Sequence, residues 1–212
     1  MDERGRSDTS DWPRGTGSEA STGHPVYTSS GATLAQDISI VIGGSAHVQL
    51  APEIAQMVNT AYGYARVSVQ EVCGRLERGG DEQPNRVLHL AFRGPQLVGC
   101  VSSTLQTGWT PSQCGHWGLL VAARAAQGTG IGRALIRAAE LRLVTGGCTH
   151  VQIEYEYSAG DAYSQRLCHW YEARLGFTRN SYWLLGRLFG MLAGHRPSTE
   201  FRTCRKELSR CS

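Results

Sequence analysis

The sequence lacks the long apolar runs and the charge blocks that mark two large classes of protein. No apolar stretch approaches the roughly 20 residues that a helix needs to cross a bilayer, so we expect no membrane span. The arginines are scattered and no block of like charges occurs, so we expect no nucleic-acid partner. A secretory signal is not visible either, because the first 35 residues are polar and carry acids among the arginines.

Paired cysteines are also missing. The seven cysteines include no CxxC spacing, and an odd number does not suit a complete set of disulfides. Most of them lie inside apolar runs, where a free cysteine behaves as a small hydrophobic residue. We therefore expect buried free thiols in a reducing compartment, the cytoplasm, and no metal site.

The composition suits one globular domain with a polar tail. Hydrophobic residues make up 41% of the 212 positions, which is enough for a core, and the net charge is only +3. Residues 1–35 are rich in Ser, Thr and Gly and nearly free of aliphatic side chains. Such a segment cannot bury enough surface to offset its ordering entropy, so we expect a disordered tail over 1–35 and a single domain over 36–212.

Hydrophobic periodicity predicts strands mixed with helices along the domain. We expect helices over residues 51–64, 68–80, 129–145 and 162–176. We expect strands over residues 37–43, 86–92, 97–105, 114–122, 150–157, 177–183 and 200–208. Strands alternate with helices only in the second half, so the fold class is α/β, with one mixed sheet of six or seven strands and helices on both faces.

A glycine-rich turn joins the apolar strand over 114–122 to the following helix. The turn reads QGTGIG and places Gly128, Gly130 and Gly132 after Gln127. A helix start offers free backbone N–H groups and a partial positive charge, and glycines let an anion approach them closely. The alternative is a tight turn that holds no ligand. The spacing matches neither the dinucleotide fingerprint nor the triphosphate loop.

A second motif follows at the end of the next predicted helix. WYEARLGF supplies a Y-E-x-x-L-G-F pattern some thirty residues after QGTGIG. The two motifs, in this order and at this separation, resemble those of the GNAT superfamily of acyl-CoA-dependent N-acyltransferases. The resemblance covers roughly residues 39–208 and implies a GNAT fold with acetyl-CoA as co-substrate and no metal.

The resemblance also implies which residues hold the coenzyme. The family's pyrophosphate-binding turn corresponds to Gln127, Gly128, Thr129, Gly130, Ile131, Gly132 and Arg133. The strand before the turn is implied to part from its neighbour at a bulge, where Leu120, Val121 and Ala122 pair with the pantetheine arm and a backbone N–H holds the oxyanion. Ala122 replaces a more usual valine, and Arg124 stands where proline is common. Ser164 matches a frequent asparagine that contacts coenzyme A.

The catalytic residues are implied in the same way. Tyr171 matches the tyrosine that protonates the leaving thiolate, although a core aromatic residue is the alternative. The attacking amine must first lose a proton, and our candidates for the base are Glu154, Glu156 and His116. Strand alternation places Glu154 and Glu156 on one face. Each of the three is otherwise a solvated or hydrogen-bonded polar residue.

The implied activity is N-acetylation of a primary amine, with a small molecule such as an amino acid, polyamine or aminoglycoside-like compound as acceptor. Two alternatives are a protein N-terminal or lysine acetyltransferase and a non-catalytic acyl-CoA-binding sensor. The segment over about 181–198 carries glycines every four residues among apolar side chains. It is interpreted as a lid over the acceptor site, a homodimer contact or a helix at the edge of the core.

Overall fold

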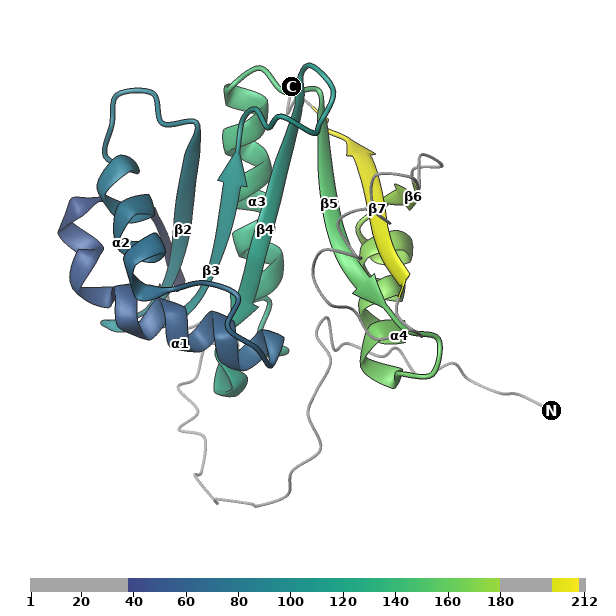
Figure 1. The fold of residues 1–212 in the computed structure, drawn as a ribbon, viewed down its shortest axis with the longest axis horizontal. Coiled ribbons are helices and arrows are strands. Elements are labelled where there is room, and N and C mark those ends of the chain that lie inside the picture. The colour runs from purple at the N-terminus through teal and green to yellow at the C-terminus, as the bar shows by residue number, and fades with distance from the viewer. Residues whose placement is uncertain (1–37, 180–199, 210–212) are drawn as a thin grey trace, which may run out of the picture.

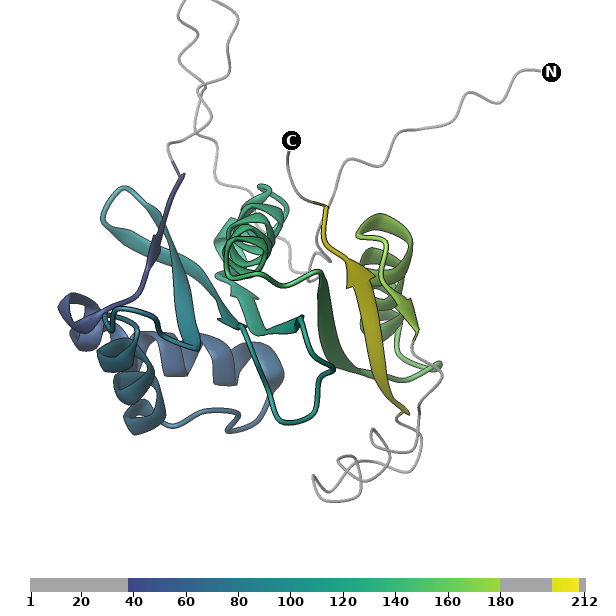
Figure 2. The same cartoon turned by 90° about the horizontal axis from the view of Figure 1, so that it is seen from above.

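The computed structural model describes residues 38–179 and 200–209, and these build one mixed sheet covered by helices on both faces (Figures 1 and 2). The strands run in the order β1-β2-β3-β4-β5-β7-β6. Only β4 and β5 are parallel, and every other neighbouring pair is antiparallel. This confirms the fold class expected from the sequence. The predicted tail over 1–35 and the segment over 181–198 lie outside the described residues.

The strands closely follow the sequence expectation. Their bounds are β1 Ile38–Ile42, β2 Arg86–Arg93, β3 Gln96–Thr104, β4 Cys114–Ala122, β5 His150–Tyr157, β6 Thr178–Arg179 and β7 Glu200–Glu207. The nearly all-apolar β4 is the fourth of seven strands, as a strand buried on both faces should be. A two-residue turn containing Gly94, whose φ is 56°, closes the β2–β3 hairpin.

The helical segments divide into two groups by the face that they cover. Their bounds are η1 Ser45–Leu50, α1 Ala51–Tyr62, α2 Val69–Arg78, η2 Arg124–Ala126, α3 Ile131–Thr145, α4 Ala162–Cys168 and a π-helical turn η3 His169–Arg174. Helices α1 and α2 bury Ile54, Val58 and Leu76 against one face of the sheet. Helix α3 and the π-helical turn pack on the opposite face in a second core that contains Leu135 and Trp170.

Local signals explain where two of these helices begin and end. Ser68 and Glu71 form the predicted capping box at the start of α2: the Ser68 side chain accepts from the Glu71 N–H, and the Glu71 carboxylate accepts from the Ser68 N–H at 2.7 Å. Gly63, with a φ of 74°, ends α1 at Tyr62, two residues earlier than the sequence pattern suggested.

A buried polar network ties α3 to the sheet. The guanidinium of Arg142 donates to the Ser103 hydroxyl at 3.1 Å and to the carbonyl of Pro84. The Ser103 hydroxyl lies 2.8 Å from Nε2 of His89, and both side chains are buried. Burial, with a smaller contribution from Arg142, lowers the pKa of His89 to about 4, so this histidine is neutral at physiological pH.

The described residues contain neither a membrane-spanning helix nor a metal-binding cluster. None of their helices combines the length and apolar character that crossing a membrane requires. Nor do three or more His, Cys, Asp or Glu side chains gather there in a way that could hold a metal ion. The six cysteines in this part of the chain are free thiols, and Cys100, Cys114, Cys148 and Cys204 are buried, as expected.

Candidate functional site

The two parallel strands at the centre of the sheet separate shortly after they begin. Only three residue pairs join β4 to β5, and the last pair is His116 with Gln152. The β3–β4 register shifts opposite Cys100–Ser102, and Leu119 has a φ of 53°, which marks a bulge in β4. Leu120, Val121 and Ala122 therefore lie beyond the last β4–β5 pair, on the part of β4 that leaves β5 (Figure 1). We call the region beyond this pair, where the two backbones part, the β4–β5 opening.

The glycine turn ends beside this opening. Gly128 and Gly130 have φ values of 76° and 86°, a conformation that L side chains rarely adopt. Because Gly130 is left-handed, α3 begins at Ile131, two residues later than the sequence pattern predicted. No side chain caps this helix start, so its first amides keep their hydrogen-bonding capacity for another acceptor.

A small hollow lies against the bare helix start. Its lining residues are Ala122, Ala126, Gln127, Gly128, Gly130, Gly132, Arg133 and Trp170. A Cβ added at Gly130 would meet no atom within 4 Å, so the space beside this residue is open. Uncapped amides, open space and the side chain of Arg133 together suit an anionic group such as a phosphate.

Some residues of the predicted phosphate-binding set turn their side chains back onto the protein. Gln127 donates to the carbonyl of Ala122 at 3.3 Å, and the Thr129 hydroxyl donates to the carbonyl of Ala126 at 2.6 Å. Ile131 is 1% exposed and belongs to the core. These side chains fix the shape of the turn, so a ligand would meet mainly its backbone. Arg93, which the sequence did not single out, supports the turn from outside with a 3.4 Å bond to Thr129.

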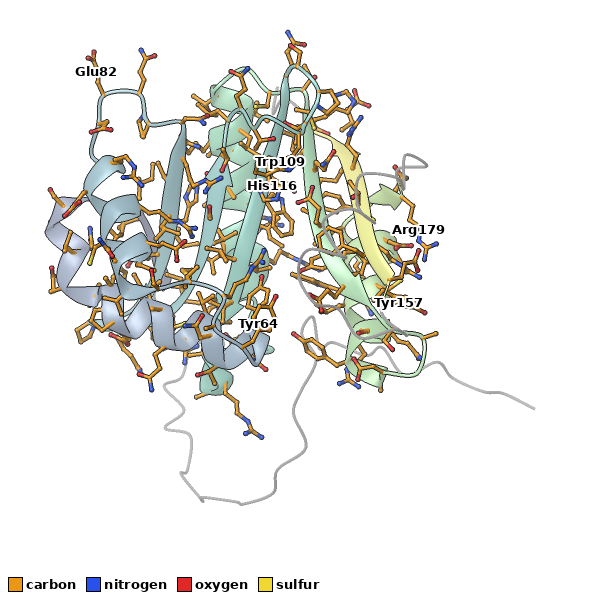
Figure 3. The ribbon with its side chains drawn as sticks, in the orientation of Figure 1. Tyr64, Glu82, Trp109, His116, Tyr157 and Arg179 are labelled. Atoms are coloured by element: carbon orange, nitrogen blue, oxygen red, sulfur yellow. The ribbon has the colours of Figure 1, made fainter. Side chains whose placement is uncertain are left out.

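On the α1 side of the sheet, two of the predicted base candidates meet at the start of the opening. His116 Nε2 lies 2.7 Å from Oε2 of Glu154, and each side chain is about one-sixth exposed, at 17% and 16%. The Trp109 ring packs edge-on against the His116 ring, with centroids 5.9 Å apart (Figure 3). The pair is thus mostly shielded from water but keeps some exposed surface.

Further hydrogen bonds keep Glu154 ionised. Burial raises the pKa of its carboxyl, but bonds from His116, Gln152 and Trp109 lower it by more, so its pKa lies below the ordinary value. Gln152 donates to Oε1 of Glu154 at 2.6 Å, and Arg205 in turn donates to Gln152 at 3.1 Å. Strand alternation in the sequence was enough to predict that Gln152 lies on the same face as Glu154. The hydrogen bond from Arg205 to Gln152 was not predictable in this way, because it depends on the register between β5 and β7.

The third base candidate, Glu156, lies on the same face of β5 as Glu154, as predicted. The structure brings Glu154, and not Glu156, into contact with His116.

Ser164, the candidate for a contact with coenzyme A, lies in the first turn of α4, where its N–H donates to the Asp161 carboxylate at 2.8 Å. This bond caps the helix, and the Ser164 hydroxyl also hydrogen-bonds to the Asp161 carboxylate, so both groups of Ser164 take part in the cap.

On the other face of the sheet, an aromatic cluster spans the opening. The Tyr171 ring packs against Tyr155 of β5 at 5.1 Å and against Trp117 of β4 at 5.9 Å between centroids. Trp117 and Tyr155 directly follow His116 and Glu154 in the chain, so they point to the opposite face. Two side-chain bridges, one on each face, therefore flank the point where β4 and β5 part.

Tyr171 lies in a π-helical turn that the sequence pattern did not predict. The expected continuous helix over 162–176 changes at His169, and the N–H of Leu175 donates to the carbonyl of Trp170, five residues earlier. The wider turn lets both Trp170 and Tyr171 face the core. Burial, with smaller contributions from Tyr62 and Tyr163, raises the pKa of Tyr171 well above the usual value, so its hydroxyl keeps its proton.

Comparison with known proteins identifies the kind of enzyme to which this arrangement belongs. The model of the acetyltransferase (GNAT) family matches residues 53–177, more than half of the chain. No curated protein matches the sequence significantly.

Solved structures agree with the family match. An aminoglycoside 6'-N-acetyltransferase complexed with coenzyme A is 15% identical and superposes with a TM-score of 0.57, over 82% of this chain and 99% of that one. The aminoglycoside 6'-N-acetyltransferase from Enterococcus faecium is 16% identical, with a TM-score of 0.56 and the same coverage of both chains. An N-acetylglutamate synthase from Neisseria gonorrhoeae, complexed with coenzyme A and N-acetylglutamate, is 16% identical with a TM-score of 0.57, over 82% of this chain and 36% of that one. At these identities the likeness shows a shared fold.

Proposed function

The chain belongs to the acetyltransferase (GNAT) family, and from this premise we propose that it moves the acetyl group of acetyl-CoA to the primary amine of a small molecule. The observation that carries the proposal is the pair of bridges across the β4–β5 opening. His116 and Glu154 lie on one face and the phenol of Tyr171 on the other, so a base and an acid can act from opposite sides of one reacting group.

The glycine turn and the separated part of β4 are the proposed coenzyme site. The backbone amides of Gly128, Gly130 and Gly132 would hold the pyrophosphate at the start of α3, and Arg133 would add positive charge. Leu120, Val121 and Ala122 have no β5 partner, so their outer edge can pair with the pantetheine amides. A backbone N–H on this segment is also the proposed donor to the oxyanion. The bound coenzyme supplies a thioester that an amine can attack directly.

His116 is the proposed base, and Glu154 is its positioning partner. An ionised Glu154 can only accept a hydrogen bond, so Nε2 of His116 carries the proton that joins them. The lone pair of a neutral imidazole then lies on Nδ1, where it can take a proton from the incoming ammonium, directly or through a water molecule. Gln152 and Arg205 hold the carboxylate in place.

Tyr171 is the proposed acid. As the tetrahedral intermediate collapses, the carbon–sulfur bond breaks and the thiolate leaves. The raised pKa of Tyr171 means that its hydroxyl is protonated when the thiolate forms. A phenol is a weaker acid than a thiol, so proximity and the dry surroundings must favour the transfer.

A small-molecule acceptor is supported by comparison only. Two similar structures are aminoglycoside 6'-N-acetyltransferases and a third is N-acetylglutamate synthase, and all three names describe acetylation of small amines. These are properties of those proteins. For this chain they make free amines the first acceptors to test, before peptides.

The test is release of coenzyme A thiol in the presence of acetyl-CoA and a panel of small amines, peptide N-termini and peptide lysines. We expect acetyl-CoA alone to raise the melting temperature and at least one small amine to release thiol faster than the peptides do. Acetylation of peptides alone would refute the small-molecule acceptor. Binding of acetyl-CoA without turnover of any amine would support a sensor instead.

Two variants on one strand face test the assignment of Glu154 as the partner of the base. Because Glu154 holds the proposed base His116 at 2.7 Å, Glu154→Gln should lower kcat by about 100-fold, the usual contribution of acid–base catalysis. Glu156→Gln, two residues along the same face, should change kcat by less than about threefold because an exposed carboxylate contributes little. The reverse order would refute the role of Glu154 and make Glu156 the catalytic carboxylate.

A further inference from the structure

Several large aromatic side chains remain exposed in the described part of the chain. Tyr62, Tyr64, Trp109 and Tyr163 are exposed by 38%, 47%, 44% and 41%. Scattered exposed aliphatic residues are ordinary, but exposed aromatic rings from separate segments that gather at one place indicate a binding surface. We call these four residues the aromatic rim.

Members of the aromatic rim lie beside β4, the strand that borders the β4–β5 opening. Trp109 precedes β4 and packs against the His116 ring, which belongs to the proposed base pair. Tyr62 ends α1 and meets Tyr64 edge-on at 6.2 Å between centroids. Figure 3 places Trp109 and His116 beside one another near the start of β4, and Tyr64 beside the other end of β4, close to the end of α1.

Two residues of the rim, Tyr62 and Tyr163, interact electrostatically with the proposed acid. Although the Tyr62 ring is partly exposed, burial of its hydroxyl raises its pKa to about 12, against the opposing charge of Arg66. Both Tyr62 and Tyr163 contribute to the raised pKa of Tyr171.

The segment that carries Tyr64 is held in place. The side-chain oxygen of Asn59 accepts from the N–H groups of Arg66 and Val67 at 2.7 and 3.0 Å, and its amide donates to the Val67 carbonyl at 2.8 Å. The Arg66 guanidinium lies 5.7 Å from the centre of the Tyr62 ring. The aromatic side chains are thus presented by an ordered loop, which reduces the entropy lost when a ligand binds.

The carboxylates that interact with residues around the opening already have partners. Glu154 is bound by His116 and Gln152, Asp161 caps α4, and Glu172 pairs with Arg202 and with the Tyr155 hydroxyl. A polycation such as a polyamine needs several free carboxylates, whereas an aromatic rim offers apolar area and ring faces for one cation.

On the premise of the proposed function, we infer that the acceptor is a primary amine attached to a flat aromatic or apolar body, with a single cationic group. The body would pack against Tyr64 and Trp109, and the amine would point toward His116. The aromatic rim would then select the acceptor, while the glycine turn binds the coenzyme.

The experiment compares acceptors and rim variants of the full chain. With acetyl-CoA saturating, we expect kcat/KM for 2-phenylethylamine and tryptamine to exceed that for spermidine and kanamycin by at least about tenfold, the selectivity that apolar contacts can supply. Tyr64→Ala should raise the KM for 2-phenylethylamine by about tenfold and leave the KM for acetyl-CoA unchanged, because Tyr64 lies on the acceptor side. Trp109→Phe, which keeps an aromatic ring, should retain more affinity than Trp109→Ala.

Leu141→Ala is the matched control, because Leu141 is also exposed, at 62%, but lies on α3 on the opposite face of the sheet. It should change neither KM. Equal or better use of spermidine or kanamycin would overturn the aromatic acceptor while leaving the acetyltransferase proposal intact. An equal effect of Tyr64→Ala and Leu141→Ala would overturn the role of the rim. If no amine is acetylated although acetyl-CoA binds, both proposals fail.

Discussion

Two glycines at opposite ends of α3 offer a controlled test of the coenzyme site. Gly130 precedes the helix and Gly147 follows it; both have a φ of 86°, and an added Cβ at either position would meet no atom within 4 Å. Only Gly130 lines the hollow at the helix start. The two positions are separated by a helix of 15 residues, which is about 22 Å long.

Alanine at either position should destabilise the fold to a similar degree. The left-handed conformation costs an L-residue about 1–2 kcal/mol. For a domain of this size, that loss lowers the melting temperature by about 2–8 °C. Since neither side chain meets a steric obstacle, the strain should be nearly the same in Gly130→Ala and Gly147→Ala.

Affinity for coenzyme A should separate the two variants. A Cβ at Gly130 enters the space that a phosphate would occupy and removes the close approach of at least one backbone donor. A hydrogen bond to a charged group contributes about 1.5–3 kcal/mol, so the Kd for coenzyme A should rise by about 10- to 150-fold in Gly130→Ala. It should change by less than about twofold in Gly147→Ala, which alters only the strain.

Isothermal titration calorimetry with coenzyme A measures this difference directly, and thermal unfolding of the unliganded variants checks that their strain is matched. Equal changes in Kd would refute the claim that the backbone at Gly130 holds the coenzyme. Unequal melting temperatures would show instead that the two glycines are not equivalent in strain.

Three further predictions concern catalysis and stability. Tyr171→Phe should lower kcat by about 100-fold or more at unchanged affinity for acetyl-CoA, because the ring packing stays and only the proton donor is lost. An unchanged kcat in steady-state kinetics would contradict the role of Tyr171 as the acid. The pKa of His89 is lower in the folded state than in the unfolded state, so its contribution to the free energy of unfolding should be complete above pH 6.5 and be lost as the pH drops toward 4. Urea unfolding should show a loss of about 2 kcal/mol between pH 7 and pH 5. The variant His89→Gln should abolish most of this loss. Ser68→Ala removes a helix cap and should cost about 1 kcal/mol in the same assay, and no loss would show that the capping box is not needed to hold α2.

Local sequence signals predicted most of the described fold. The bounds of β5 agree with the expected residues 150–157, and the capping box at Ser68 forms as its spacing indicates. Both depend on residues close together in the chain, so strand alternation and capping chemistry determine them. The start of α3 was predicted two residues early because helical periodicity says nothing about the left-handed φ of Gly130.

Features that depend on contacts between distant segments were not predictable. Gln152 was overlooked because its partner Arg205 is 53 residues away, and His89 was not expected to meet Ser103 and Arg142 beneath α3. The π-helical turn also escaped prediction, because the residues over 162–176 fit an ordinary helix and the wider turn depends on tertiary packing of neighbouring aromatic side chains. The roles of Tyr171, His116 and Glu154 stay predictions until the variants are measured.

The short pairing between β4 and β5 has a mechanical consequence. Strands β1–β4 and strands β5–β7 share only three residue pairs across the middle of the sheet, so the backbone hydrogen bonds that join these halves are few. A coenzyme that binds along the unpaired edges of both strands would add contacts that hold the two halves of the sheet together. At a ligand concentration 100 times its Kd, binding to the folded state adds about 2.7 kcal/mol to stability. Amide hydrogen exchange should therefore slow on both sides of the sheet when coenzyme A is added, far beyond the residues that touch it.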